Sequence, residues 1–412
     1  MGRLLRPILV AALAAAALVT PVRAVTGSSS ASYIVVLKDS VSKPASVARD
    51  HAYRYGVDVE FVYRAALKGY AGTVPTDQLA RLEADSRVAF VSRDAPVSAD
   101  AQVLPTGIDR IDADLSPTAR IDGVDQRVDV DAAVIDTGVD QHPDLNVVGG
   151  VNCTPGPDDA FDDGLGHGTH VAGTIGALDN GFGVVGVAPG ARIWSVRVLG
   201  SGGFGFRSWV ICGIDWVTAH ADVIEVANMS LSGGGSDDGN CGLTNDDAEH
   251  LAICNSVAAG VTYAVAAGNQ ATDAATRVPA SYDEVITVSA LADFDGKPGG
   301  LGSPTCRDDE DDTLANFSDF GADVDLIAPG VCILSTVPTS GQISSPSGYG
   351  TISGTSMATP HVTGAAGLYT ATHPSATAAQ VRRALIRLGS SNWNAVDDPD
   401  GIKEPLLQAS SL

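Results

Sequence analysis

Three short segments of the chain carry a hydroxyl, an imidazole and a carboxylate in motifs that could work together. Ser356 lies in the sequence Gly-Thr-Ser-Met-Ala, His167 begins His-Gly-Thr-His, and Asp136 begins Asp-Thr-Gly directly after an apolar run. A serine hydroxyl attacks a carbonyl at neutral pH when a histidine takes its proton and a carboxylate orients that histidine. The three segments therefore predict acyl-transfer chemistry.

Each motif also has another interpretation when it is taken alone. Asp-Thr-Gly occurs in aspartic proteases, but these use two such carboxylates, and the chain has no second Asp-Thr-Gly or Asp-Ser-Gly. His-Gly-Thr-His could bind a metal, but the companion ligands are missing. Gly-Thr-Ser-Met-Ala is similar to the Gly-x-Ser-x-Gly elbow of α/β hydrolases, in which serine precedes the acid and the histidine. The order here is reversed, which favours the acyl-transfer interpretation of all three motifs together.

The chain begins with the pattern of a secretory signal peptide. Arg3 and Arg6 precede an apolar run at 8–19, and small residues follow up to Ala24. A helix that spans a bilayer needs ~20 residues, so a short membrane anchor is the less favoured alternative. We expect a signal peptide at 1–24, cleavage after Ala24, a secreted and extracellular product, and no membrane association once the signal is removed.

Six cysteines in an exported chain indicate disulfide bonds. Two pairs flank polar insertions, and pairing them leaves a third pair: Cys241–Cys254, Cys306–Cys332 and Cys153–Cys212. Fifteen connectivities are possible for six cysteines, so this pairing is one choice among them. Their spacing does not suggest a zinc site.

Charge divides the chain into two parts. Residues 1–101 contain 12 basic and 9 acidic residues, whereas 102–412 contain 13 and 40, within a total net charge of −24. A mildly basic segment ahead of a strongly acidic body suggests two units that attract each other. A soluble surface adapted to a salty or acidic habitat explains the acidity equally well. Such a body is not expected to bind nucleic acid.

The periodicity of apolar residues predicts two structural units. Segment 32–97 alternates strands (33–37, 57–63, 70–74 and 88–91) with helices (45–55 and 76–84), an order that suits a small ferredoxin-like α+β fold. Residues 98–105 form a cleavable linker and the start of the second unit. In 106–412, buried strands at 130–135, 193–198, 223–227, 262–266 and 285–289 alternate with helices such as 208–220. This predicts an α/β unit with a mostly parallel sheet flanked by helices.

Taken together, the motifs resemble the subtilisin-like serine proteases (peptidase S8), from the signal through an inhibitory I9-type propeptide to the peptidase domain. The cysteines favour the proteinase K-like branch. The resemblance implies that Asp136 orients His167, that His167 is the base and that Ser356 is the nucleophile. It also implies that the Asn269 side chain and the Ser356 N–H form the oxyanion hole. His170, the second histidine of its motif, would be structural.

The same resemblance assigns residues to substrate binding. The family holds an extended peptide between two backbone segments, which here correspond to Gly203, Phe204 and Gly205 and to Ser230, Leu231 and Ser232, with Ala266 and Gly268 at the far wall of the primary pocket. Ser232 stands where the family usually has glycine, so the shape of that pocket differs. An apolar pocket predicts a large uncharged P1 residue. Leu199, Val210 and Leu231 would form an outer pocket, where Arg207 either accepts acidic substrate residues or pairs with surface acids.

Segment 177–184 resembles the calcium loop of the family. The resemblance implies one structural Ca²⁺ with oxygen ligands that suit a hard cation: Gln102, Asp144, Leu178, Asn180, Phe182 and Val184. An ordinary glycine-rich loop is the alternative. The acidic run at 308–312 could hold a second ion, but such runs are more often solvated.

The expected function is that of a secreted serine endopeptidase made as a self-processing zymogen. Its partners would be protein or peptide substrates and its own propeptide, with self-cleavage near Asp100–Ala101, and we expect a monomer. Two alternatives remain, a processing peptidase of narrow specificity and an inactive homologue that only binds. The complete set of catalytic residues argues against the inactive homologue.

Overall fold

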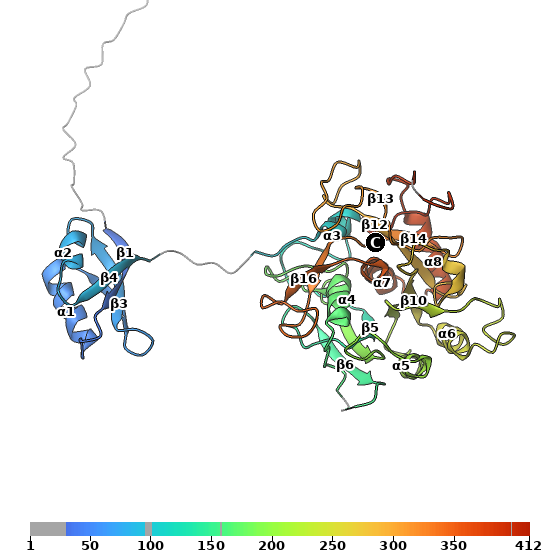
Figure 1. Cartoon of the computed structure of the whole chain (residues 1–412), viewed down its shortest axis with the longest axis horizontal. Coiled ribbons are helices and arrows are strands. Elements are labelled where there is room, and N and C mark those ends of the chain that lie inside the picture. Colours follow the sequence, from blue (N-terminus) through green and yellow to red (C-terminus); the bar gives the residue numbers. More distant parts are fainter. Residues whose placement is uncertain (1–29, 95–100, 157–158, 397) are drawn as a thin grey trace, which may run out of the picture. The chain divides into compact units, whose positions relative to one another are not determined.

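We describe a computed structural model of the 412-residue chain, in which residues 30–94, 101–156, 159–396 and 398–412 are described (Figure 1). The chain divides into two compact units, Met1–Ser98 and Ala99–Leu412. The predicted signal peptide and Asp100 lie outside the described residues. Among the described residues, no helix combines the length and the apolar character that a membrane crossing requires.

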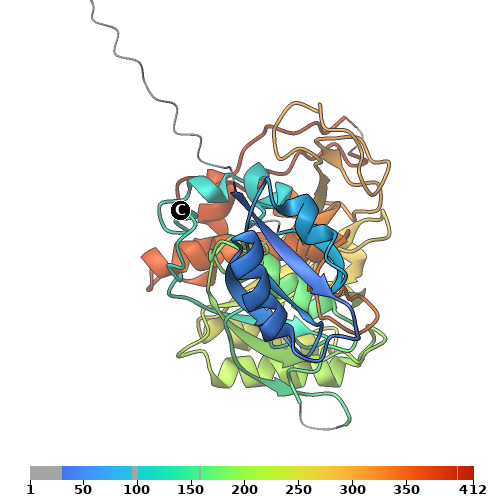
Figure 2. The same cartoon turned by 90° about the vertical axis from the view of Figure 1, so that its left-hand side faces the viewer.

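The first unit is a small α+β fold built from six elements in the predicted order. They are β1 (Ser30–Leu37), α1 (Pro44–Tyr55), β2 (Asp58–Tyr63), β3 (Gly69–Pro75), α2 (Leu79–Glu83) and β4 (Val88–Arg93). The strands form an antiparallel sheet in the order β2-β3-β1-β4. The two helices lie on one face of the sheet (Figure 1), the face turned toward the viewer in Figure 2. This is the ferredoxin-like arrangement expected from the sequence.

The second unit is organised around an eight-stranded sheet with the order β13-β12-β10-β8-β5-β7-β6, in which β14 also pairs with β12. All neighbouring strands are parallel except β12 and β13. The strand bounds are β5 (Asp131–Asp136), β6 (Val147–Asn152), β7 (Arg192–Arg197), β8 (Val226–Met229), β10 (Thr262–Ala266), β12 (Ile286–Ala292), β13 (Thr313–Leu314) and β14 (Leu326–Pro329). The chain leaves β5 for one side of the sheet and later returns to its other side. Ligands of such folds bind where the strand order reverses in this way.

Helices cover both faces of this sheet. The principal ones are α4 (His167–Gly176), α5 (Arg207–Ala219), α6 (Ala248–Ala258), α7 (Thr355–Thr372) and α8 (Ala378–Leu388), with short helices α3 (Thr106–Arg110), η1 (Ala113–Leu115) and η2 (Ala274–Thr276). Two small antiparallel sheets add β9 (Gly233–Gly234) with β11 (Arg277–Val278), and β15 (Ile333–Thr336) with β16 (Tyr349–Ile352).

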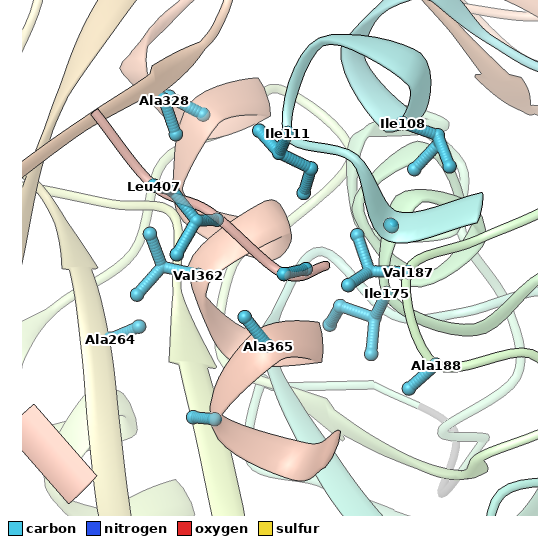
Figure 3. Close-up of a cluster of buried hydrophobic side chains, with 14 of the residues drawn as sticks. Ile108, Ile111, Ile175, Val187, Ala188, Ala264, Ala328, Val362, Ala365 and Leu407 are labelled. Carbon is cyan, nitrogen blue, oxygen red and sulfur yellow. The ribbon is translucent and has the colours of Figure 1, made fainter. Parts of the chain in front are cut away.

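Strand β5 contributes to two separate hydrophobic cores. Ala132 and Val134 join the core formed with α4, α7 and α8, whereas Ala133 and Ile135 join the core formed with α5 and α6. This alternation follows from the two-residue period of a strand. Figure 3 shows part of the first core, with α7 and its small residue Ala365 at the centre. Small side chains on α7 let it pack closely against β8, β10, β12 and α4.

The predicted fold class is confirmed for both units, but several element boundaries differ. The strand predicted at 223–227 is β8 at Val226–Met229, and the one predicted at 285–289 extends to Ala292. Strands β6 and β14 were not predicted. The three disulfide bonds predicted from the spacing of the cysteines are confirmed: Cys153–Cys212, Cys241–Cys254 and Cys306–Cys332.

The prediction that the acidic run at 308–312 is solvated is wrong for three of its residues. Asp309, Asp311 and Asp312 are each at most 4% exposed. Asp312 pairs with the buried guanidinium of Arg110, and Asp311 accepts hydrogen bonds from the backbone N–H groups of two residues in the preceding loop. These partners compensate the carboxylates for the loss of water, so the run is part of the folded structure.

Candidate active site

Asp136, His167 and Ser356 lie at the ends of elements that meet beside the point where the strand order of the sheet reverses. Asp136 is the last residue of β5, His167 is the first residue of α4, and Ser356 is the second residue of α7. Helices α4 and α7 pack against each other. Segments more than 180 residues apart thereby converge, because the carboxyl ends of parallel strands and the helix starts that follow them share one edge of the sheet.

Asp136 and His167 form a close pair. The Nδ1 atom of His167 lies 2.7 Å from Oδ1 of Asp136, and the Asp136 side chain has no exposed surface. The backbone N–H of Thr137 donates to the same Oδ1 at 2.7 Å. Burial disfavours the charged imidazole, but the charge and the hydrogen bond of Asp136 outweigh burial, so the pKa of His167 is raised above its ordinary value. The carboxylate therefore holds the Nδ1 proton and leaves Nε2 as the basic nitrogen.

Ser356 is held from its backbone by Ser230. The Ser230 hydroxyl donates to the carbonyl of Ser356 at 2.8 Å. That carbonyl would ordinarily accept from the residue four positions later, which is Pro360 and has no N–H. In this structure the Ser356 hydroxyl donates to the carbonyl of Ser230 at 3.3 Å rather than to His167. Hydrogen bonds of a nucleophile are often loose without substrate.

Asn269 is oriented by the residue that precedes Ser356. Its Oδ1 accepts from the backbone N–H of Thr355 at 2.8 Å and from the Thr355 hydroxyl at 3.1 Å. Because the oxygen is occupied, the amide N–H₂ group remains as a donor. The N–H of Ser356 belongs to the first turn of α7, where backbone N–H groups have no partner within the helix. The two donors predicted for an oxyanion hole are thus tied together through Thr355.

A cavity of about 300 Å³ adjoins His167 and contains most of the predicted substrate-binding residues. Its lining includes Gly203, Phe204, Gly205, Ser230, Leu231 and Ser232, and also Leu199 and Val210 of the predicted outer pocket. The two residues predicted for the far wall, Ala266 and Gly268, do not line this cavity, and both are buried. Phe204 is 83% exposed at its edge, where an extended peptide would pass.

One wall of the cavity contains an ion cluster that was only partly anticipated. Arg207 lies 3.2 Å from Asp247 and 3.6 Å from Glu249, and its guanidinium also donates to the carbonyl of Gly234 at 2.6 Å. Burial raises the pKa of Glu249 to about 7, against the attraction of Arg207. Arg207 is thus already paired with acids of the protein, as in the second of its two predicted interpretations, but these acids are buried rather than on the surface. Nothing near Arg207 in the sequence indicated these partners, which lie 40 residues away or more.

The buried histidines next to the site are structural in character. Nε2 of His170 donates to the carbonyl of Ile333 at 2.9 Å, and burial lowers the pKa of His170 to about 3. His361 contacts the carbonyl of Met357 at 2.9 Å, and burial lowers its pKa to about 4. Both imidazoles are neutral at ordinary pH. The interpretation of His170 as a hydrogen-bonded residue of the helix agrees with these contacts.

The residues predicted to bind calcium lie together on one side of the second unit. The Gln102 amide nitrogen lies 2.6 Å from the carbonyl of Leu178 and 3.1 Å from that of Val184. Asp144 is fully buried and accepts from Asn180 at 2.8 Å. Phe182 is linked to the group through its N–H, which donates to Oδ1 of Asn180 at 3.1 Å.

The donor set of this loop fits a hard cation. The oxygen and the NH2 group of an amide are similar in size, so a half-turn of the Gln102 and Asn180 amides would direct their oxygens toward the carbonyls and the carboxylate that their nitrogens now contact. The groups that donate hydrogen bonds to the Asp144 carboxylate are all neutral: the Asn180 amide, the Tyr349 hydroxyl and the N–H of Val184. A cluster of carbonyl, amide and carboxylate oxygens is the kind of site that Ca²⁺ prefers.

Comparisons with known proteins agree with this architecture. The model of the Subtilase family matches residues 128–400, and that of Peptidase inhibitor I9 matches residues 32–100. Subtilisin NAT of Bacillus subtilis subsp. natto is 37% identical over 358 residues, which cover 86% of this chain and 84% of that protein. The extracellular serine proteinase of Thermus sp. (strain Rt41A) is 41% identical over 344 residues, 82% and 74% of the two chains.

A solved structure shows the same fold. The crystal structure of a cold adapted subtilisin-like serine proteinase is 35% identical in sequence and superposes with a TM-score of 0.57, covering 74% of this chain and 97% of that one. The predicted subtilisin-like fold is thereby confirmed, whereas the comparisons do not single out the proteinase K-like branch. The chain therefore belongs to the subtilase family, and it is a serine endopeptidase made as a zymogen with an I9 inhibitor domain ahead of its peptidase domain.

Proposed function

We propose that Ser356 is the nucleophile, His167 the general base and Asp136 the residue that orients His167, with Asn269 and the N–H of Ser356 as oxyanion donors. His167 takes the proton of the Ser356 hydroxyl as it attacks the peptide carbonyl, and then gives it to the leaving amine. Water repeats the sequence on the acyl-enzyme. The observation that supports these roles best is the 2.7 Å contact between His167 and buried Asp136.

Covalent labelling tests the identity of the nucleophile. The secreted protein is treated with a fluorophosphonate, digested and analysed by mass spectrometry, beside an assay with a chromogenic Ala-Ala-Pro-Phe amide. We expect the label on Ser356 and loss of hydrolysis in proportion to labelling. A folded and processed enzyme that is neither labelled nor active would support the inactive homologue. Labelling of Ser356 without turnover of simple peptides would support the processing peptidase of narrow specificity.

Replacing Asn269 by alanine should lower kcat by about 100- to 1000-fold with a much smaller change in KM. The amide of Asn269 would meet the oxygen only when that oxygen becomes negative, and a preorganised donor of this kind contributes mainly to the transition state. Steady-state kinetics on the peptide amide measure both constants. Gln270→Ala is the matched control, since Gln270 is the exposed next residue, and it should retain activity. A loss confined to KM would contradict the oxyanion role.

We propose that an extended substrate runs along the cavity between the segment at 203–205 and the segment at 230–232. Glycines at 203 and 205 let a peptide backbone approach closely, and strand addition supplies its hydrogen bonds. Ala266 and Gly268 would form the far wall of the primary pocket, where a large uncharged P1 residue fits best. Broad degradation of proteins is the expected role.

We propose one structural Ca²⁺ held by the set described above: Gln102, Asp144, Asn180 and the carbonyls of Leu178, Phe182 and Val184. Bound there, Ca²⁺ would neutralise the buried carboxylate of Asp144 and join the loop at 177–184 to the start of the peptidase domain. The hydrogen bonds of Gln102 and Val103 to the carbonyls of Gly181 and Gly183 already connect these segments.

Removing calcium with a chelator should lower the melting temperature of the mature enzyme. A ligand that binds only the folded state, at a concentration of about 100 times its Kd, raises the free energy of unfolding by about 2.7 kcal/mol. Because each kcal/mol shifts the melting temperature by roughly 2–4 °C, removing the ligand should lower the melting temperature by roughly 5–11 °C. Scanning calorimetry on enzyme blocked with fluorophosphonate avoids self-digestion. Asp144→Asn should show a low melting temperature that the chelator does not change further. An unchanged melting curve of the wild type in excess chelator would contradict the site.

We propose further that the chain is secreted through its signal peptide and matures by self-cleavage near Asp100–Ala101. The acidic surface of the second unit would attract individual basic residues of the propeptide, which over 25–101 has nine basic and nine acidic residues and so no net charge. We propose domain limits of 1–24 for the signal, 32–97 for the propeptide, 98–105 for the linker and 106–412 for the peptidase, which would act as a monomer.

A further inference from the structure

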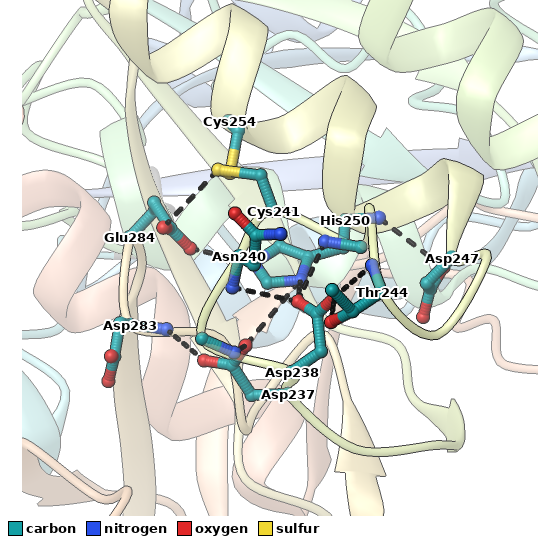
Figure 4. Close-up of a disulfide and its surroundings, with 12 residues drawn as sticks. Asp237, Asp238, Asn240, Cys241, Thr244, Asp247, His250, Cys254, Asp283 and Glu284 are labelled. Atoms are coloured by element: carbon teal, nitrogen blue, oxygen red, sulfur yellow. Dashed lines mark hydrogen bonds and ion pairs between the residues drawn. A yellow bond between two sulfur atoms is a disulfide. The ribbon is translucent and has the colours of Figure 1, made fainter.

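His250 is a buried histidine with one ring nitrogen that has no hydrogen-bond partner among the described residues. It lies in the first turn of α6 and has no exposed surface. Its free nitrogen, Nδ1, points between two carboxylates and lies 3.6 Å from Oδ1 of Asp237 and 3.6 Å from Oδ1 of Asp238 (Figure 4). Buried polar atoms are nearly always paired, so this nitrogen requires an explanation.

The rest of the His250 ring is fixed in position. Its other nitrogen, Nε2, lies 2.9 Å from Oε2 of Glu284. The ring stacks on Tyr282 with centroids 4.0 Å apart and planes within 2°. The Tyr282 hydroxyl donates to Asp247, which also caps α6. Histidines that bind metals usually donate their second N–H to a carboxylate in this way, and this contact fixes both the tautomer and the ring orientation.

The two carboxylates differ in how many further contacts they can accept. Asp237 accepts one N–H on each oxygen, from Gly239 at 2.7 Å and from Asp283 at 3.2 Å, so each oxygen keeps a lone pair. Asp238 accepts four hydrogen bonds from the backbone and side chain of the loop that follows it. Its Oδ1 could bind a cation only if one of these N–H contacts lengthened. Asp237 is therefore the more available oxygen ligand, and Asp238 contributes mainly its charge.

A disulfide bond makes this cluster rigid and limits the chemistry it can offer. Cys241 follows the two aspartates and is bonded to Cys254 on α6, so the loop is tied to the helix that carries His250 (Figure 4). Both sulfurs also lie close to His250 and Glu284. As disulfide sulfurs they are not thiolates, which are the form of cysteine that binds metals. The available ligands are thus one imidazole nitrogen and carboxylate oxygens.

We propose that His250, Asp237 and Asp238 bind one divalent transition-metal ion of the zinc type, with Glu284 orienting the imidazole and water completing the coordination. Imidazole nitrogen with carboxylate oxygen suits Zn²⁺, whereas Ca²⁺ takes oxygen ligands only. Zinc bonds of about 2.0–2.2 Å place neighbouring ligands of a tetrahedron roughly 3.3–3.6 Å apart, which matches the 3.6 Å between Nδ1 and each Oδ1.

The bound ion would stabilise one wall of the substrate cavity. It would connect the loop at 237–244 to the start of α6, where Asp247 and Glu249 hold Arg207 beside the cavity. This metal is separate from the proposed calcium, which lies at Asp144 and the loop at 177–184. Its function is structural and does not involve the catalytic residues.

Metal titration of the full-length chain carrying Ser356→Ala tests the site without self-digestion. The protein is saturated with Ca²⁺ and then titrated with Zn²⁺ by calorimetry, and with Co²⁺ by its visible absorption. We expect one site that raises the melting temperature, that His250→Gln abolishes and that Asp237→Asn weakens by at least 100-fold. Glu284→Gln should weaken binding by about 10- to 100-fold, as the loss of an orienting partner does.

His373→Gln is the matched control, because His373 also stacks on a tyrosine, Tyr369, but is exposed. It should bind zinc as the parent protein does. Circular dichroism checks folding of each variant, and if His250→Gln fails to fold, Asp237→Asn decides, since that side chain is partly exposed on the loop. Absence of zinc uptake, equal uptake by the Asp237 variant, or uptake that appears only after the Cys241–Cys254 bond is reduced would overturn the proposal.

Discussion

The Ser356→Ala variant should lose peptidase activity by about a million-fold in kcat, the loss typical when the nucleophile of a Ser–His–Asp unit is removed. The three groups act as one unit, so the base and the orienting carboxylate cannot compensate for a missing hydroxyl. After signal removal the variant should also keep its propeptide, because the proposed maturation uses the same active site. Both results come from one preparation, by single-turnover kinetics on the peptide amide and by gel electrophoresis.

The control for this variant is Ser230→Ala. The Ser230 hydroxyl donates to the backbone carbonyl of Ser356 and has no proposed part in the chemical step, so its loss should reduce kcat far less than the loss of Ser356. Near-wild-type activity of Ser356→Ala would contradict the assignment of the nucleophile. A dead variant that is still cleaved near Asp100–Ala101 would show that another peptidase matures the chain, and would leave the catalytic role intact.

The sequence predicted the strands that are buried on both faces better than the others. Strands β5 and β10 are continuous apolar runs, as expected for a parallel sheet covered by helices. Strand β6 (Val147–Asn152) contains two consecutive glycines, and β14 has only three apolar residues before Pro329, so the signal is weak in both. Their pairing depends on neighbouring strands that a pattern along the chain does not describe.

The candidate site was predictable where its residues follow directly on such strands. Asp136 is the last residue of β5 and Asn269 lies three residues beyond the end of β10, and their motifs locate them. The partners that hold these residues were not predictable, because they come from distant segments. The hydrogen bond between Ser230 and Ser356 joins residues 126 positions apart. Only the proline at position 360 marks it in the sequence, because that proline leaves the carbonyl of Ser356 free.

The acidic run at 308–312 shows the limit of predictions based on composition. Five consecutive acidic residues ordinarily indicate a solvated loop. Here Arg110, about 200 residues earlier, enters the same region and pairs with Asp293 and Asp312. Burial nevertheless raises the pKa of Asp293 to about 7. The local sequence contains no sign of Arg110, so the burial of these carboxylates is a property of the tertiary structure.

Replacing Asp136 by asparagine should lower kcat by about ten thousand-fold while the structure is retained. Asparagine has the size of aspartate, but it supplies an N–H₂ group as well as an oxygen. It can therefore stabilise the tautomer of His167 whose proton is on Nε2, and this tautomer cannot accept the serine proton. It also removes the charge that stabilises the imidazolium in the transition state. Kinetics at pH 8 measure the loss, and circular dichroism shows whether the fold is intact.

The dependence of the rate on pH shows whether Asp136 controls the protonation of His167 or only supports the structure. Neutral His167 is the active form, so kcat/KM of the wild type should fall as the pH drops through the pKa of His167, which Asp136 raises above the ordinary value of 6.5. Without the carboxylate that pKa falls, and the acid limb of the residual activity should move to lower pH. The neighbouring buried carboxylate Asp163 accepts from Thr137 and Thr169 instead of from His167, so Asp163→Asn should shift the limb much less. An acid limb at the same pH in Asp136→Asn and wild type would mean that Asp136 does not set the protonation of His167.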